Sequence, residues 1–200
     1  AYFCSRGSVM GRVPGEVVAA AFAVFNPAVV IPAVAHGWTL TDAVSIEAAR
    51  TEGAVAQLTR ILGAEPEGVE RIADLRARAG AAGRVEGKPL FAGLASQAVP
   101  DGVLGAAWRY ADRLREYRGD AHVAAWTSAG FDAVEIGLMT ELYWGLPLKS
   151  YIRTRAWSEA ELEAGIGRLE RRGLVGGGEL TARGREAREA VEAGTDRACR

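Results

Sequence analysis

Apolar residues recur at intervals of three and four along most of the chain, which is the spacing of amphipathic α-helices. Proline at first helical positions, Ser, Thr or Asp caps and glycine stops divide this pattern into separate helices. The predicted helices cover residues 14–25, 27–34, 41–62, 66–79, 90–96, 101–118, 121–129, 132–144, 158–173 and 181–198. Gly119 is predicted to end one of them. Strand-like alternation is confined to residues 174–181, so the predicted fold class is mainly α with one small β-hairpin.

Two stretches of the chain have a similar order of features and predict tandem helix-turn-helix-like units. In the first, an apolar helix is followed by Pro27 and, 11 residues later, by Trp38 and a long helix. In the second, an apolar helix is followed by Pro147 and, 10 residues later, by Trp157 and another long helix. Only the second stretch continues into a hairpin, so we expect a wingless unit followed by a winged one.

Length and composition permit one domain or two small ones. The chain has 200 residues, 49% of them hydrophobic and 24% charged, with a net charge of −1. The Gly- and Ala-rich segment 80–87 is the best candidate for a linker. We therefore expect an N-terminal unit over residues 1–87 and a C-terminal unit over residues 88–200, or both within one compact domain. The even charge balance excludes a strongly basic nucleic-acid-binding protein and an acidic disordered tail.

The last fifty residues are organised as a helix, a hairpin and a second helix. Ser158 and Glu161 have the spacing of a capping box, in which each side chain bonds the backbone N–H of the other residue. Gly173 follows two arginines and is predicted to end the helix. The three glycines at 176–178 form the tip of a short wing between two strands.

Two motifs in this region, Leu169–Val175 and Leu180–Arg185, resemble the C-terminal part of the MarR-type winged-helix regulators. Segments 22–27 and 114–125, with the Trp157-Ser158 pair, are similar to a narrower actinobacterial group, the SalK-type helix-turn-helix proteins. The second resemblance extends over nearly the whole chain. It implies a mainly helical protein with a MarR-like winged-helix end. It also favours a regulator that binds a small organic ligand, and together with the apolar terminal helices it predicts a homodimer.

DNA binding is disfavoured by the charges of the predicted recognition helix. In a winged-helix protein, the first residues of this helix lie nearest the bases. Three of the residues there are acidic and would be repelled by the phosphates: Glu159, Glu161 and Glu163. The candidate DNA-binding cations lie at the far end: Arg168, Arg171 and Arg172. Residues 151–200 hold ten Arg and nine acidic residues, a net charge of +1, which is not the footprint of a DNA-binding surface.

His122 is the single residue that most directly indicates chemistry, because an imidazole can act as acid or base near neutral pH. Helical spacing places Arg118 on the same face as His122, and Trp126 follows one turn later. With Tyr117 and Asp120 they predict a polar pocket for an anionic or aromatic ligand. His122 and Asp120 would be the catalytic residues if the protein is an enzyme. The alternative is a histidine packed at a helix junction, with Asp120 capping a helix.

A second predicted ligand site combines the N-terminus with the first repeat stretch. Aromatic side chains mixed with one Arg and one Asn are typical of a small-molecule cavity between helices. The candidates are Tyr2, Arg6, Phe25, Asn26, His36 and Trp38. The alternative is that Asn26 caps a helix and the aromatic side chains belong to the core.

No metal or cofactor site is predicted. Cys4 and Cys199 lack the spacing of a zinc site or a disulfide framework and fit a reducing cytoplasm. Glu135 and Glu141 are six residues apart and do not share a helix face, which disfavours a di-metal bundle. The motifs of serine hydrolases, zinc proteases, phosphate-binding loops and dinucleotide-binding folds are missing from the sequence.

A membrane span is not expected. Residues 17–35 are uncharged and about as long as a membrane-spanning helix. Asn26-Pro27 lies in the middle of this stretch and Pro32 follows, so the sequence predicts two short buried helices instead. The N-terminus has no basic segment followed by an apolar run, and a cytoplasmic location is expected.

Three functions fit these observations. The first is a MarR-like regulator that binds a small organic ligand and has weak or lost DNA binding. The second is a cofactor-free enzyme of natural-product metabolism that uses a His/Arg/Asp pocket on the same scaffold. The third is a structural module that binds a protein partner.

Overall fold

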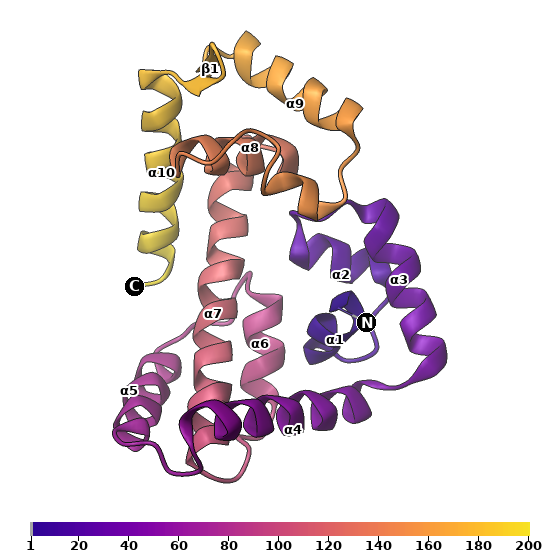
Figure 1. The fold of residues 1–200 in the computed structure, drawn as a ribbon, viewed down its shortest axis with the longest axis vertical. Helices are drawn as coiled ribbons and strands as arrows, with labels where there is room; N and C mark the ends of the chain where they lie inside the picture. The colour runs from indigo at the N-terminus through magenta and orange to yellow at the C-terminus, as the bar shows by residue number, and fades with distance from the viewer. Residues whose placement is uncertain (1) are drawn as a thin grey trace. The chain divides into compact units, whose positions relative to one another are not determined.

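A computed structural model describes residues 2–200, and over these residues the chain is mainly helical with one two-stranded antiparallel sheet (Figure 1). This confirms the predicted fold class. The α-helices are α1 (Tyr2–Gly7), α2 (Gly15–Phe22), α3 (Pro27–Leu40), α4 (Ala43–Leu62), α5 (Val69–Ala81), α6 (Pro89–Ser96), α7 (Val103–Ser128), α8 (Ala133–Tyr143), α9 (Glu159–Arg171) and α10 (Ala182–Ala198). The 3₁₀-helices are η1 (Ser8–Met10) and η2 (Ile152–Arg155), and the strands are β1 (Val175–Gly176) and β2 (Glu179–Leu180).

The chain divides into two compact units. The first comprises the residues up to Ala21 together with Ile31–Asp120, and the second comprises Phe22–Val30 with Ala121–Arg200. The division therefore falls within α2, α3 and α7. These compact units have other bounds than the expected N-terminal unit 1–87 and C-terminal unit 88–200. The division into functional units at residues 87 and 88 stays a prediction.

Helix α7 corrects one sequence expectation. Gly119 was expected to end a helix, but α7 continues through it from Val103 to Ser128. Glycine inside a helix costs about 1 kcal/mol relative to alanine. Packing around this position outweighs that cost: Tyr117 before it is 8% exposed, and Asp120 and Ala121 after it are 4% and 1% exposed. Local propensity predicted a break that the tertiary contacts override.

The second unit contains the winged-helix arrangement of α8, η2, α9, the hairpin and α10. Asp132 and Glu135 form a capping box at the start of α8, and Ser158 and Glu161 form the expected one at the start of α9. One apolar cluster fills the interior, with Leu138, Leu162 and Leu169 each at most 1% exposed. These contacts place α9 against α8.

The wing is as short as predicted. Val175 pairs with Leu180 and Gly176 with Glu179, so only Gly177 and Gly178 form the loop. Their φ angles of 60° and 80° are those of a type I′ turn, which favours glycine at both central positions. Gly184 lets α10 begin beside this hairpin, because an added Cβ would lie 1.9 Å from the carbonyl oxygen of Leu174.

The two stretches that resemble each other in sequence differ in local structure. Pro27 begins a helix of 14 residues that contains Trp38. Pro147, in contrast, is followed by a turn and the four-residue η2 before Trp157. Each indole does donate a hydrogen bond to a backbone carbonyl, Trp38 to Val13 at 2.8 Å and Trp157 to Val24 at 2.9 Å. The shared feature is this tryptophan anchor.

Within residues 2–200, no single helix is both long enough and apolar enough to cross a membrane. Helices α3 and α4 pass that test only when taken together, and they are bent by 95° relative to each other.

Candidate functional site

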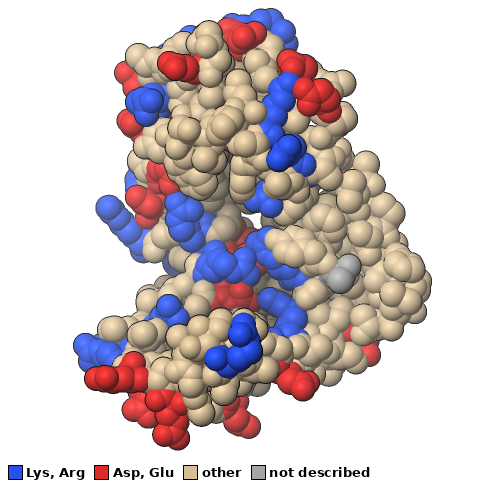
Figure 2. Space-filling view, in the orientation of Figure 1, with Lys and Arg blue, Asp and Glu red and all other residues tan. Residues whose placement is uncertain are grey.

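The acidic start of α9 is exposed and engaged by a lysine. The side chains of Glu159 and Glu163 are 71% and 60% exposed, and the Lys149 ammonium contacts both carboxylates. These carboxylates raise the pKa of Lys149. Glu161 is used locally, because it accepts the backbone N–H of Ser158 at 2.8 Å. Figure 2 shows acidic and basic atoms side by side on the surface over α9.

Two of the three predicted DNA-binding arginines are held in ion pairs with the start of α8. Arg168 donates to Asp132 at 2.6 Å, and Arg172 donates to Glu135 at 2.9 Å. The Arg172 guanidinium also lies 4.5 Å from the centre of the Phe131 ring. Arg171 is exposed. Arg168 and Arg172 therefore join α9 to α8, and their charges are compensated by Asp132 and Glu135.

Glu141 has a role that the sequence reasoning missed. Its side chain is fully buried, and it accepts backbone N–H groups from Lys149 at 2.8 Å, Tyr151 at 2.5 Å and Ile152 at 2.6 Å. A buried carboxylate with three charge-assisted hydrogen bonds organises the turn between α8 and η2. The only signal in the sequence is that Glu141, the second glutamate of a largely apolar helix, comes four residues before a Gly-Leu-Pro turn.

Tyr117 and Asp120, two members of the predicted His122 pocket, face α6 in the first unit. The Tyr117 ring packs on Phe91 with 4.8 Å between centres. Asp120 accepts the backbone N–H of Phe91 at 2.9 Å and so caps α6 from a neighbouring helix. Burial raises the pKa of Asp120 to about 6, and the nearby Glu116 carboxylate adds to the rise. The sequence predicted that Asp120 caps a helix that begins after Gly119, but α7 continues through Asp120, and its carboxylate caps α6 instead.

His122 and Trp126 belong to the second unit. His122 Nδ1 lies 3.0 Å from the Thr195 hydroxyl, which donates its one proton to the carbonyl of Val191 at 2.9 Å. Because this hydroxyl already donates its proton, it can accept a hydrogen bond from Nδ1 in the tautomer that carries the proton there. The Glu192 carboxylate lies 4.0 Å from the same nitrogen, so α10 presents two acceptors to the imidazole. Trp126 is 4% exposed and belongs to the apolar core.

Helix geometry explains why the predicted His122 pocket does not gather. Successive residues on a helix are rotated by about 100°, which turns Tyr117 and Asp120 well away from His122 and Trp126. Arg118 is exposed on α7. The five residues predicted to form one pocket therefore lie in different surroundings, Tyr117 and Asp120 against Phe91 and His122 against Thr195.

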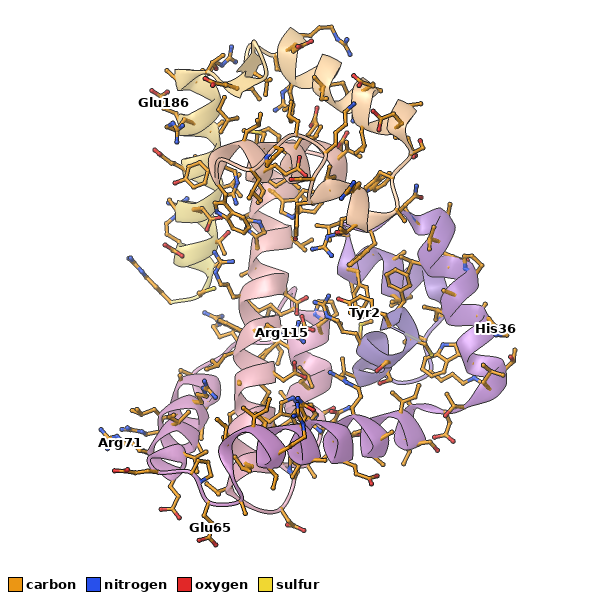
Figure 3. The ribbon with its side chains drawn as sticks, viewed as in Figure 1. Tyr2, His36, Glu65, Arg71, Arg115 and Glu186 are labelled. Carbon is orange, nitrogen blue, oxygen red and sulfur yellow. The ribbon has the colours of Figure 1, made fainter. Side chains whose placement is uncertain are left out.

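Tyr2 and Arg6 meet at a charged cluster in the first unit. Arg6 makes two hydrogen bonds of 2.8 Å to Glu116 and one of 3.1 Å to the Tyr2 hydroxyl. Arg115 donates to Glu116 at 2.8 Å and to Asp112, which also pairs with Arg50 at 3.1 Å. Figure 3 shows Tyr2 on α1 and Arg115 on α7. The exposed rim of this cluster offers guanidinium and phenol donors.

The other members of the second predicted site are placed apart. Asn26 caps α3 by accepting the N–H of Ala28 at 3.0 Å, which is the alternative considered from sequence. Phe25 stacks on the Arg155 guanidinium at 4.6 Å in the second unit. Trp38 is 8% exposed, while His36 is exposed on the outer side of α3 (Figure 3).

No group of three His, Cys, Asp or Glu side chains within the described residues is arranged to hold a metal ion. Cys4 and Cys199 are not joined by a disulfide.

Helix, turn, helix and hairpin in this order define a helix-turn-helix protein with a small wing. A helix-turn-helix family matches residues 1–200, so the chain belongs to that family. No curated protein and no solved structure gives a significant match.

Proposed function

We propose that the protein is a MarR-like, cytoplasmic winged-helix regulator that binds a small organic ligand and has weak affinity for DNA. Membership of a helix-turn-helix family supports the regulatory role. The observation that carries the proposal of weak DNA binding is the charge of α9. Glu159 and Glu163 are exposed where a recognition helix meets the bases, and Arg168 and Arg172 are paired within the protein.

This arrangement leaves few cations for phosphate contacts. The strength of DNA binding and its salt dependence both rise with the number of phosphates that the protein neutralises. The wing adds no cation, because its loop is Gly177-Gly178 and Glu179 follows. DNA would be held mainly by Arg171 and by arginines at the start of α10.

Fluorescence anisotropy with a labelled DNA duplex tests this proposal. We expect weak binding at about 50 mM salt, with an affinity that falls by roughly the first or second power of the salt concentration. Replacing Glu159→Gln and Glu163→Gln together removes repulsion and should strengthen binding several-fold. Nanomolar binding of the unaltered protein at physiological salt would contradict weak affinity, and no salt-dependent binding by either protein would contradict a DNA-binding role.

We also propose a homodimer. Four apolar side chains on α4 and α5 are 43–60% exposed and support an interface: Ile61, Leu62, Ile72 and Leu75. Light scattering after size exclusion should give the mass of two chains, and a monomer at all concentrations would remove this part of the proposal.

A second candidate is a cofactor-free enzyme in which His122 acts as acid or base. The contacts of its Nδ1 with Thr195 at 3.0 Å and Glu192 at 4.0 Å favour this candidate, because they hold the imidazole in one orientation. His122→Ala separates the two functions. An enzyme would lose turnover and keep ligand binding, whereas a regulator would keep its DNA affinity and lose at most its response to ligand.

A further inference from the structure

A groove in the first unit lies outside every site predicted from the sequence. It runs between α4 and the connection from α6 to α7, where α4 crosses α7 (Figure 1). Its volume is about 510 Å³, within the usual range of small-molecule sites. The apolar walls are formed by Val44, Ala48, Val55, Ala98 and Pro100. Val44 is 78% exposed, so the groove leaves a large aliphatic surface in contact with water.

The charged side chains of the groove do not balance. Arg109 is 1% exposed, and its Nη2 lies 3.1 Å from the Glu47 carboxylate, so these two charges compensate each other. Glu52 and Asp101 also line the groove, and within residues 2–200 neither is in an ion pair. The groove therefore combines aliphatic walls with two exposed carboxylates that are in no ion pair within residues 2–200.

We propose that this groove binds a small organic cation, an amine with an aliphatic body. The ammonium group would lie at the carboxylates of Glu52 and Asp101, and the chain would cover the side chains of Val44 and Val55. Binding of the cation stands independently of DNA binding, but its role as the ligand of a regulator rests on the function proposed above.

One feature of the groove favours the opposite charge. Arg109 Nε is buried and has no hydrogen-bond acceptor in the described part of the chain. Its two terminal nitrogens do have acceptors, however, because Nη1 donates to Gln97 and Nη2 donates to Glu47 at 3.1 Å and to Thr51 at 3.3 Å. An anion would also face the carboxylates of Glu52 and Asp101. A cation is therefore the better match.

Three eight-carbon probes that differ only in charge test the proposal: octylammonium, octan-1-ol and octanoate. Calorimetric titration of the full chain at low salt should give octylammonium about tenfold tighter binding than octan-1-ol, and octanoate the weakest. Added salt should reduce this preference. Equal affinity for the three probes, tightest binding of octanoate, or no binding of octylammonium would overturn the proposal.

Two matched pairs of variants locate the site. Glu52→Gln with Asp101→Asn should abolish the preference for octylammonium over octan-1-ol. Glu65→Gln with Glu67→Gln removes the same charge from the exposed α4–α5 connection and should not change it (Figure 3 labels Glu65). Ala48→Trp should fill the groove and block octylammonium and octan-1-ol, whereas Ala56→Trp, exposed on α4 outside the groove, should leave both bound. Equal effects within either pair would refute this location.

The outcomes separate the two proposals. If octylammonium binds the groove and no DNA is bound, the ligand site stands and the regulatory function fails. If DNA is bound and octylammonium is not, the regulatory function stands and the cation site fails.

Discussion

The part of helix α7 that belongs to the first unit, up to Asp120, and helix α9 in the second unit both carry charged residues at intervals of three and four, but these charges have opposite surroundings. On α7, Arg109, Asp112, Glu116 and Asp120 are all at most 7% exposed. On α9, the side chains of Glu159 and Glu163 are 60% exposed or more. Similar helical spacing thus gives a buried ionic face on α7 and exposed carboxylates on α9.

The difference comes from the neighbouring elements. Helices α1, α4 and α6 cover the charged face of α7 and supply its partners, which include Arg6, Arg50 and the backbone N–H of Phe91. A buried charge without a partner costs several kcal/mol, so each of these carboxylates depends on its neighbours. The exposed glutamates of α9 can be hydrated by water, so they do not depend on their contact with Lys149.

The largest expected effect is from Glu116→Ala. It leaves Arg6 and Arg115 facing each other without the carboxylate between them, and we expect a loss of about 3–5 kcal/mol in the free energy of unfolding. Glu163→Ala, an exposed glutamate on a helix, is the matched control and should leave the urea midpoint unchanged. Similar losses in the two variants would refute the contrast between the helices.

The buried carboxyl group of Asp120 should make the stability of the fold depend on pH. Because burial raises its pKa to about 6 in the folded state, the folded protein binds more protons than the unfolded chain between about pH 4 and pH 6. Its contribution to stability therefore falls as pH rises through this window, by about 3 kcal/mol in total. Asp120→Asn retains an acceptor for Phe91 and should lack this loss. Urea unfolding of both proteins from pH 4 to pH 7 checks the prediction, and parallel curves would contradict it.

Glu141 is a buried carboxylate in the second unit, the unit that contains α9. Its substitution therefore tests whether burial, and not the unit, decides how much stability is lost. Glu141→Gln keeps one carbonyl oxygen for three backbone N–H groups, so at least one buried donor loses its acceptor. We expect a loss of about 2 kcal/mol, with an α8–η2 turn that exchanges its amide hydrogens faster. Glu170→Gln, exposed on α9, is the control. An unchanged exchange rate at Tyr151 and Ile152 would show that Glu141 is not what holds the turn.

The smallest effect is expected at the start of α9. Replacing Glu159 and Glu163 by Gln should not change the unfolding midpoint, although it strengthens DNA binding in the anisotropy experiment described above. A marked loss of stability would mean that the Lys149 contacts support the fold, and the contrast with α7 would then disappear.

Much of the fold was predictable because its signals are local. The capping box of Ser158 and Glu161, the end of α9 near Gly173 and the hairpin around residues 177–178 each depend on residues within about one turn of each other. The surroundings of the candidate site residues were not predictable in this way. His122 reaches Thr195, 73 residues away, and Arg6 reaches Glu116, 110 residues away, and neither pairing has a signal in a single sequence.

The sequence by itself determined where most of the helices begin, where the wing turns and that the start of α9 is acidic, because backbone propensity and capping act over three or four residues. It did not predict α1, and it placed a helix start at residue 121, inside α7. Only the tertiary structure decided that α7 passes through Gly119, that Asp120 caps α6, and that Arg168 and Arg172 are paired to α8. The physical reason is that the free energy of a charged or polar side chain depends on burial and on partners from distant segments, which helical periodicity does not specify.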